Sequence, residues 1–198
     1  VWFNVFQQAK AEEDEGLLIH GGTSGIGVMG LQIAKALGLK TFTTVGSQEK
    51  LDFIEEHQLA KGINYKETAF EEVFKEDKID VILDMVGGDY THKNLELLHT
   101  QGRLIHINGM KSLTPQIDLW TVMSKQLILS GSLLKPQPIE IKERIAEDVK
   151  EKVWPLLASG QVKPIIHKVF KLEEAAQAHQ LMESSAHIGK IILENSDS

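Results

Sequence analysis

The sequence predicts an α/β fold in which six parallel strands form a doubly wound sheet with helices on both faces. Short β-branched runs alternate with amphipathic helical stretches along the first two thirds of the chain. Residues 80–86 (DVILDMV) are almost continuously apolar, as expected for a strand at the centre of such a sheet. A glycine-rich turn at 20–30 (HGGTSGIGVMG) joins the first strand to the first helix. Ligands of this fold bind beyond the carboxyl ends of the strands.

The order of the elements supports this prediction. The expected strands are 17–20, 41–45, 63–65, 81–86, 103–107 and 127–133. The expected helices between them are 25–38, 49–57, 69–76, 91–99 and 118–124. Parallel strands joined by helical crossovers are covered on both faces, and the crossovers are right-handed. The N-terminal VWFNVFQQAK is expected to be a helix with one apolar side.

The pattern changes after the sixth strand. A long helix is expected over 139–158, followed by a strand at 164–170, a helix at 173–184 and a closing strand at 189–193. We therefore divide the chain into a dinucleotide-binding domain, residues 1–160, and a C-terminal strand-helix-strand tail, residues 161–198.

Composition excludes several classes of function. The net charge of −7 argues against a nucleic-acid partner, and no apolar run is long enough to span a membrane. The chain has no cysteine, which removes disulfides and thiolate chemistry and is compatible with the reducing cytoplasm, our expected location. No signal-peptide pattern opens the chain, and a start at Val1 is typical of a piece of a longer protein.

The glycine-rich turn has the composition of a phosphate-binding loop. Glycines permit close approach of a ligand, and the N–H groups of the following helix and its dipole favour an anion. The turn matches G-x-G-x-x-G imperfectly, with Gly22, Ser24 in place of the second glycine, Gly25, and Gly27 at the third. The alternative is an ordinary strand-to-helix turn. The strand, turn and helix in βαβ order favour a dinucleotide.

The end of the second strand favours NADP over NAD. An NAD site places an acidic residue there to bind the ribose 2′-hydroxyl, whereas this chain has Gly46 and Ser47 and no acid before Glu49. Lys50 is positioned to pair with a 2′-phosphate, and Tyr65 ends the third strand beside the expected adenosine. The alternatives are that Lys50 is a solvated helix lysine and Tyr65 an ordinary strand-end aromatic.

Several separated blocks resemble one family. HGGTSGIG, AKALG, INY, ILDMVGGDY, GRLIHI and HIGKIIL, in this order, resemble the quinone oxidoreductases of the medium-chain dehydrogenase/reductase superfamily, in the zeta-crystallin-like, NADPH-dependent branch. The resemblance covers essentially the whole chain. It implies that the chain is the nucleotide-binding half, that an N-terminal GroES-like catalytic domain is absent, and that the tail from about residue 161 completes that domain.

The resemblance also implies the cofactor, NADPH, and its contacts. The pyrophosphate turn matches Ser24, Gly25, Ile26 and Gly27, and the 2′-phosphate and adenosine end matches Gly46, Ser47, Lys50 and Tyr65. Gly87 and Gly88 match the segment near the ribose, and Ile107, Asn108, Gly109, Gly131, Ser132 and Leu133 match segments that flank the nicotinamide. Some relatives have an arginine near the 2′-phosphate where this chain has MESSAHIG, so selectivity would depend more on Lys50.

The activity implied by the resemblance is hydride transfer from NADPH to a quinone or a similar conjugated carbonyl such as an enone, without zinc. The cofactor supplies this chemistry, which is consistent with the absence of a recognisable catalytic triad. The resemblance further implies a homodimer, and the apolar sixth strand is the natural edge for its pairing.

Two alternatives come from other classes. The turn also satisfies the T-G-x-x-x-G-x-G pattern of short-chain dehydrogenases, but neither Tyr65 nor Tyr90 has a lysine at the fourth following position, as that family requires. A non-catalytic NADP-binding module is the second alternative. His92, His99 and His106 are seven residues apart, but the third lies in a strand, so a metal site is not favoured.

Overall fold

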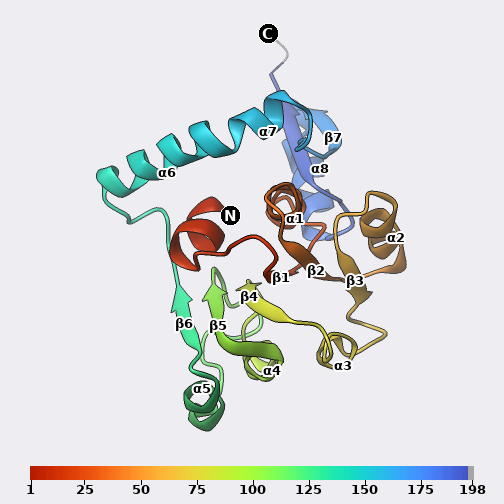
Figure 1. The fold of residues 1–198 in the computed structure, drawn as a ribbon. Coiled ribbons are helices and arrows are strands. Elements are labelled where there is room, and N and C mark those ends of the chain that lie inside the picture. Colours follow the sequence, from red (N-terminus) through yellow and green to blue (C-terminus); the bar gives the residue numbers. More distant parts are fainter. Residues whose placement is uncertain (196–198) are drawn as a thin grey trace.

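The computed structural model describes residues 1–195 and contains the predicted six-stranded parallel sheet (Figure 1). Its strand order is β3-β2-β1-β4-β5-β6, with every neighbouring pair parallel. The strands are β1 (Gly16–His20), β2 (Lys40–Val45), β3 (Lys61–Asn64), β4 (Ile79–Asp84), β5 (Leu98–His106) and β6 (Ile128–Gly131). The chain winds outward in one direction from β1 and in the other from β4, so the topological switch point lies between these two central strands.

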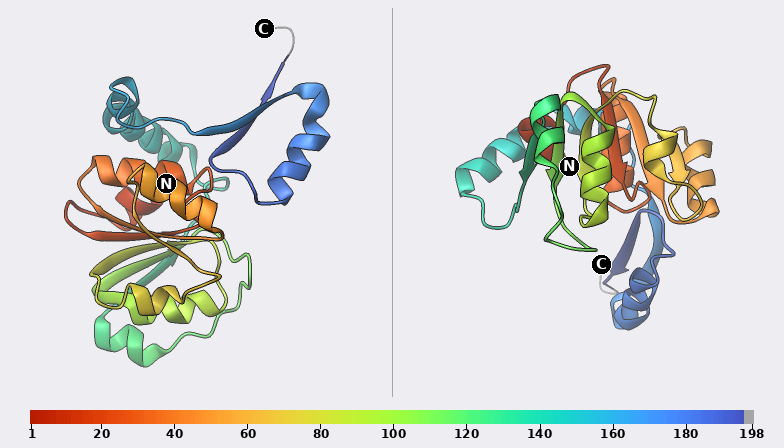
Figure 2. Two further views of the ribbon diagram at one scale, coloured as in Figure 1. Left: turned by 90° about the vertical axis from the view of Figure 1, so that its right-hand side faces the viewer. Right: turned by 90° about the horizontal axis from the view of Figure 1, so that it is seen from below.

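Helices cover both faces of the sheet (Figure 2). The first five are α1 (Gly27–Ala36), α2 (Gln48–Glu56), α3 (Phe70–Val73), α4 (Asp89–Leu97) and α5 (Leu119–Lys125). Side chains from α1 and α2 pack in one apolar cluster with the sheet, and side chains from α3 and α4 pack in a second cluster on the opposite face. The two clusters meet at the central strands, where every residue of β1 and β4 is buried. This confirms the central place predicted for DVILDMV.

Four predicted elements differ in detail. β5 begins at Leu98, five residues before the expected strand 103–107 and within the end of the expected helix 91–99. The helix expected over 139–158 is divided into α6 (Ile139–Lys152) and α7 (Trp154–Ala158), because Pro155 has no N–H to continue the hydrogen-bond ladder. The N-terminal helix is a π-helix over Phe3–Gln8, in which the Ala9 N–H donates to the Asn4 carbonyl at 3.0 Å. The third crossover helix is shorter than the expected 69–76.

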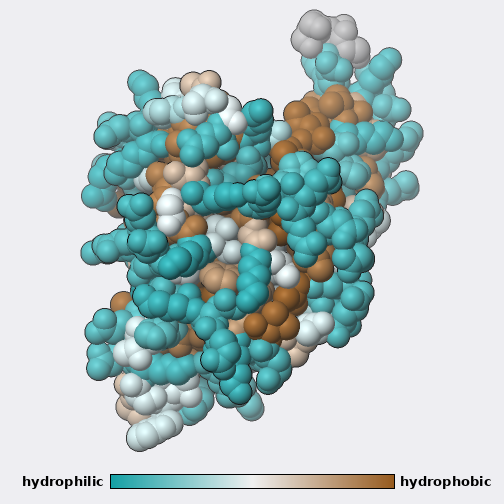
Figure 3. Space-filling view, turned by 45° about the vertical axis from the view of Figure 1, so that its right-hand side comes forward, coloured by the Kyte–Doolittle hydropathy of each residue, from teal (hydrophilic) through white to brown (hydrophobic). Residues whose placement is uncertain are grey.

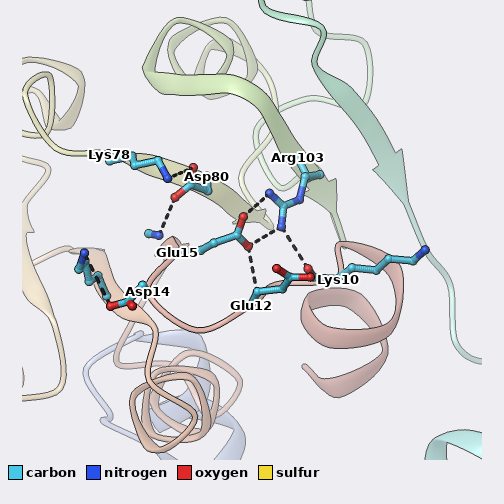
Figure 4. A network of polar contacts seen from close by, with 9 residues as sticks. Lys10, Glu12, Asp14, Glu15, Lys78, Asp80 and Arg103 are labelled. Carbon is cyan, nitrogen blue, oxygen red and sulfur yellow. Dashed lines mark hydrogen bonds and ion pairs between the residues drawn. The ribbon is translucent and has the colours of Figure 1, made fainter.

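A polar network fastens the segment before β1 to the sheet (Figure 4). Arg103 in β5 donates to both carboxylate oxygens of Glu15, at 2.8 and 2.6 Å, and to the Ala9 carbonyl at 2.9 Å. The buried Asp80 carboxylate accepts from the Gly16 N–H at 2.9 Å. Burial acts to raise the pKa of Glu15, but the hydrogen bonds from Arg103 and the Glu12 N–H and the charge of Arg103 outweigh it and lower that pKa.

The C-terminal tail has the predicted strand-helix-strand order and projects from the main body (Figures 1 and 2). It contains β7 (Ile166–Lys171), a short 3-10 turn (Leu172–Glu174), α8 (Ala175–Glu183) and β8 (Lys190–Glu194), and β7 and β8 form a separate parallel pair. Hydrophobic side chains are exposed on it below its grey end (Figure 3). Within residues 1–195, no helix combines the length and the apolar character that crossing a bilayer requires.

Candidate functional site

The turn between β1 and α1 is rich in glycine, and neighbouring atoms lie too close to two of these glycines to leave room for a side chain. A Cβ atom on Gly27 would lie 2.3 Å from the Gly21 carbonyl oxygen, and one on Gly22 would lie 2.0 Å from Thr43 Oγ1. Gly21 has a φ of 75°, a left-handed conformation that favours glycine. These three glycines therefore allow α1 to pack closely on the strand end, with its N-terminus aimed across the carboxyl edge of the sheet.

Ser24 and Ile26 have different places in this turn. The Ser24 hydroxyl accepts from the Gly27 N–H at 2.9 Å and so satisfies one N–H at the start of α1. Ile26 is 43% exposed at the surface of the turn. The residues expected to bind the pyrophosphate thus lie next to one another at the start of α1, and Ser24 also caps this helix.

The space above Gly25 holds a cation from the C-terminal tail. A Cβ on Gly25 would lie 2.6 Å from Lys190 Nζ, so this ammonium group lies directly over the turn. The Gly189 N–H donates to the Thr23 carbonyl at 2.8 Å, which ties the start of β8 to the same turn. Sequence reasoning quoted Lys190 within HIGKIIL and gave it no role, because 165 residues separate it from Gly25 in the chain.

The ends of β2 and β3 bring together the other expected cofactor residues. A Cβ on Gly46 would lie 2.9 Å from the Tyr65 hydroxyl, and the Ser47 hydroxyl caps α2 by accepting from the Lys50 N–H at 3.4 Å. The Tyr65 side chain is 44% exposed at this edge. Lys50 Nζ donates to the Ser185 carbonyl at 2.5 Å, so this lysine is held by the tail as well as by α2.

The surroundings of Lys50 lower the pKa of its side chain. Burial lowers the pKa of its ammonium group, Glu49 acts in the opposite direction, and the like charge of Lys66 lowers it again. An ammonium group that is partly desolvated and lies near a second cation is a favourable partner for an incoming dianion.

A cavity of about 830 Å³ opens beside β5 and β6, at the carboxyl ends of these strands. Seven of the expected cofactor residues line it, namely Gly87, Ile107, Asn108, Gly109, Gly131, Ser132 and Leu133. Gly88 lies beside the cavity and precedes α4, with a φ of 59°. Sequence reasoning missed the far wall, which is a loop that supplies Ser112, Leu113, Pro115 and Ile117.

A buried polar network lies under this edge of the sheet. The Asp84 carboxylate, fully buried, accepts from the Val86 N–H at 2.6 Å and the Asn94 side-chain amide at 3.2 Å. His20 Nε2 lies 2.8 Å from the Asn94 side-chain oxygen. Burial lowers the pKa of His20, which keeps this imidazole neutral. Asp84 thus serves as a hydrogen-bond acceptor for the loop that follows β4.

The histidines spaced by seven residues do not converge. His92 pairs with Glu96 on the surface of α4, whereas His106 lies beside Asp84 within the sheet. In residues 1–195, no three His, Asp or Glu side chains lie close enough together to hold a metal ion.

Comparison with known proteins places this arrangement in a family. Residues 58–193 match the family described as zinc-binding dehydrogenase. The chain is 32% identical over 194 residues to the quinone oxidoreductase of Rattus norvegicus, covering 96% of this chain and 57% of that protein. It is 31% identical to the highly reducing polyketide synthase frbB of Dothideomycetidae sp. (strain 11243), covering 98% of this chain and 8% of that protein.

Among solved structures, the quinone oxidoreductase of Escherichia coli in complex with NADPH superposes with a TM-score of 0.80 at 27% identity. That match covers 97% of this chain and 60% of the other. The chain thus spans less than two thirds of the oxidoreductases it matches. The family match, the quinone oxidoreductase relatives and the common fold show that the chain belongs to the zinc-binding dehydrogenase family, in the nucleotide-binding half of the medium-chain dehydrogenases and reductases.

Proposed function

We propose that this chain binds NADPH and is the nucleotide-binding half of a zinc-independent reductase that transfers hydride to a quinone or a similar conjugated carbonyl. The observation that carries the proposal is the arrangement along the carboxyl edge of the sheet. A glycine turn capped by Lys190 lies at the switch point, Lys50 lies on one side of it, and the 830 Å³ cavity lies on the other.

The pyrophosphate binds at the turn of Ser24, Gly25, Ile26 and Gly27. The N-terminus of α1 and the ammonium group of Lys190 place two sources of positive potential around the bare backbone of Gly25. Because Lys190 lies over the turn before any ligand enters, its side chain moves aside and then pairs with the phosphate.

The adenosine end binds at Gly46, Ser47, Lys50 and Tyr65. No carboxylate ends β2, so a 2′-phosphate meets no repulsion there, and Lys50 with Lys66 nearby supplies opposite charge. The Ser185 carbonyl that holds Lys50 gives way to a phosphate, which is the stronger acceptor.

The residues that line the cavity would hold the nicotinamide, and NADPH would supply the hydride there. Gly87 and Gly88 have positive φ values and leave room for the ribose against the backbone. Ile107, Asn108, Gly109, Gly131, Ser132 and Leu133 form the walls that orient the ring and exclude water from one side. The relatives named quinone oxidoreductase support the substrate class.

The proposal extends to the domain division, the cellular location and the oligomeric state. Residues 1–160 form the nucleotide-binding domain, and residues 161–198 belong with the catalytic domain of a longer, cytoplasmic protein. The protein forms a homodimer through β6, the edge strand of the sheet, where Ile128 is 56% exposed.

Two lysine variants test the cofactor assignment by calorimetric titration with NADPH and NADH. Lys50→Ala is expected to weaken NADPH about tenfold or more and to leave NADH nearly unchanged, because NADH has no 2′-phosphate. Lys190→Met is the matched control. Because both nucleotides contain the pyrophosphate, this variant is expected to weaken NADPH and NADH by similar factors. Equal affinity of the unmodified chain for both nucleotides, or no binding of either, would contradict the proposal.

A further inference from the structure

One titratable side chain faces the cavity. Of the residues that line it, His106 alone carries an imidazole, a side chain able to donate and accept protons in catalysis, and this side chain is 27% exposed. It ends β5 and is the register partner of Asp84 in β4, so the two side chains share a face of the sheet. His106 Nδ1 lies 3.4 Å from Asp84 Oδ2.

The carboxylate that faces His106 is held in place. Besides the Val86 N–H, the Gly87 N–H donates to the Asp84 carboxylate at 3.2 Å, so two N–H groups of the loop after β4 hold this carboxylate. Asn94, itself paired with His20, holds Oδ2 from the side. A buried carboxylate held in this way beside one ring nitrogen fixes the orientation of the imidazole.

The other ring nitrogen is free for a ligand. Among residues 1–195 no hydrogen bond engages His106 Nε2. The hydroxyl groups of Ser132 and Ser112 already have side-chain partners, and the Ser130 hydroxyl accepts from Gln8. The Asn108 side-chain amide also lines the cavity and can donate a hydrogen bond, but only the His106 imidazole can also transfer a proton to a carbonyl oxygen.

We propose that His106 donates a hydrogen bond from Nε2 to the carbonyl oxygen of the substrate and passes that proton to it, with Asp84 as its positioning residue. This inference rests on the proposed function. Hydride from NADPH leaves a negative charge on the substrate oxygen. The Nε2–H bond of the imidazolium then breaks, an O–H bond forms, and the imidazole becomes neutral. A proton from solvent restores the imidazolium through its exposed side.

Nitrogen NMR of the ¹⁵N-histidine-labelled chain tests the contact without turnover. NADP⁺ is added first, and menadione follows as the carbonyl probe; the chain has no cysteine for the quinone to alkylate. Menadione is expected to shift the Nε2 resonance of His106 while Nδ1 keeps its proton toward Asp84. Menadione binding that leaves Nε2 unmoved, or no menadione binding at millimolar concentration, would overturn the inference.

Variants separate donation from packing. His106→Leu is expected to lose menadione affinity about tenfold and keep NADP⁺ affinity, and His106→Gln, which keeps a donor, recovers most of the loss. His92→Leu is the control, because His92 lies on the outer surface of α4. Unchanged menadione affinity in His106→Leu would refute the donor role. If the unmodified chain did not bind NADP⁺, that result would instead count against the proposed function. The menadione titration would still test whether His106 contacts the carbonyl oxygen.

Discussion

The substitution Gly27→Ala tests how the glycine turn is built. A Cβ at this position would lie 2.3 Å from the Gly21 carbonyl oxygen and 2.7 Å from the Gly22 Cα atom. Both are backbone atoms of the same turn, so no side-chain rotation relieves the clash. Ordinary contact begins near 3.4 Å, so α1 must move away from the strand end by roughly 1.1 Å, the difference between these two distances.

The cost follows from this displacement. Overpacking a tightly packed site costs about 1–3 kcal/mol. The gain in helix propensity from Gly to Ala, up to about 1 kcal/mol in a helix interior, is small here because Gly27 is the first residue of α1. We expect the free energy of unfolding to fall by about 1–3 kcal/mol, which lowers the melting temperature by roughly 2–12 °C in a chain of this size.

Urea unfolding followed by circular dichroism measures the change, with Gly25→Ala as the matched control. A Cβ on Gly25 meets only the far end of the Lys190 side chain, which can swing away, so its cost is expected to stay within about 0.5 kcal/mol. If Gly27→Ala were as stable as the unmodified chain, or if Gly25→Ala were the more damaging of the two, the close-packing account of the turn would be wrong.

Two further predictions concern acid stability and association. The pKa of Glu15 is lower in the folded chain than its ordinary value, so its pairing with Arg103 stabilises the fold above about pH 4.3 and is lost as the pH falls through the folded pKa. Glu15→Gln should therefore cost about 1–2 kcal/mol at pH 7 in urea unfolding, and this cost should shrink as the pH falls through the folded pKa of Glu15; a cost independent of pH would contradict this. Ile128→Lys should shift sedimentation from dimer to monomer, because a charge on the β6 edge opposes strand pairing; a chain already monomeric at micromolar concentration would refute the dimer.

The fold class and most element boundaries were predictable because their signals are local. Apolar runs of three to seven residues, separated by amphipathic stretches, determine which segments become buried strands, and right-handed crossovers then leave few topologies. The division of the helix predicted over 139–158 also has a local cause, because Pro155 lacks an N–H. The π-helical form of Phe3–Gln8 was not predictable, because it depends on how Trp2 and Val5 pack against distant residues of the sheet and of α6.

The candidate site divides in the same way. Glycines at the β1–α1 turn and Lys50 after β2 are recognisable from spacing, since each follows a predicted strand end. Lys190 over Gly25 and His106 beside Asp84 are juxtapositions of residues far apart in the chain, and no periodicity encodes them. The sequence by itself determined the fold class and the edge of the sheet where a nucleotide would bind. Only the tertiary structure decided which charged groups meet there, because Coulomb energies and hydrogen bonds depend on distances in space and not on separation along the chain.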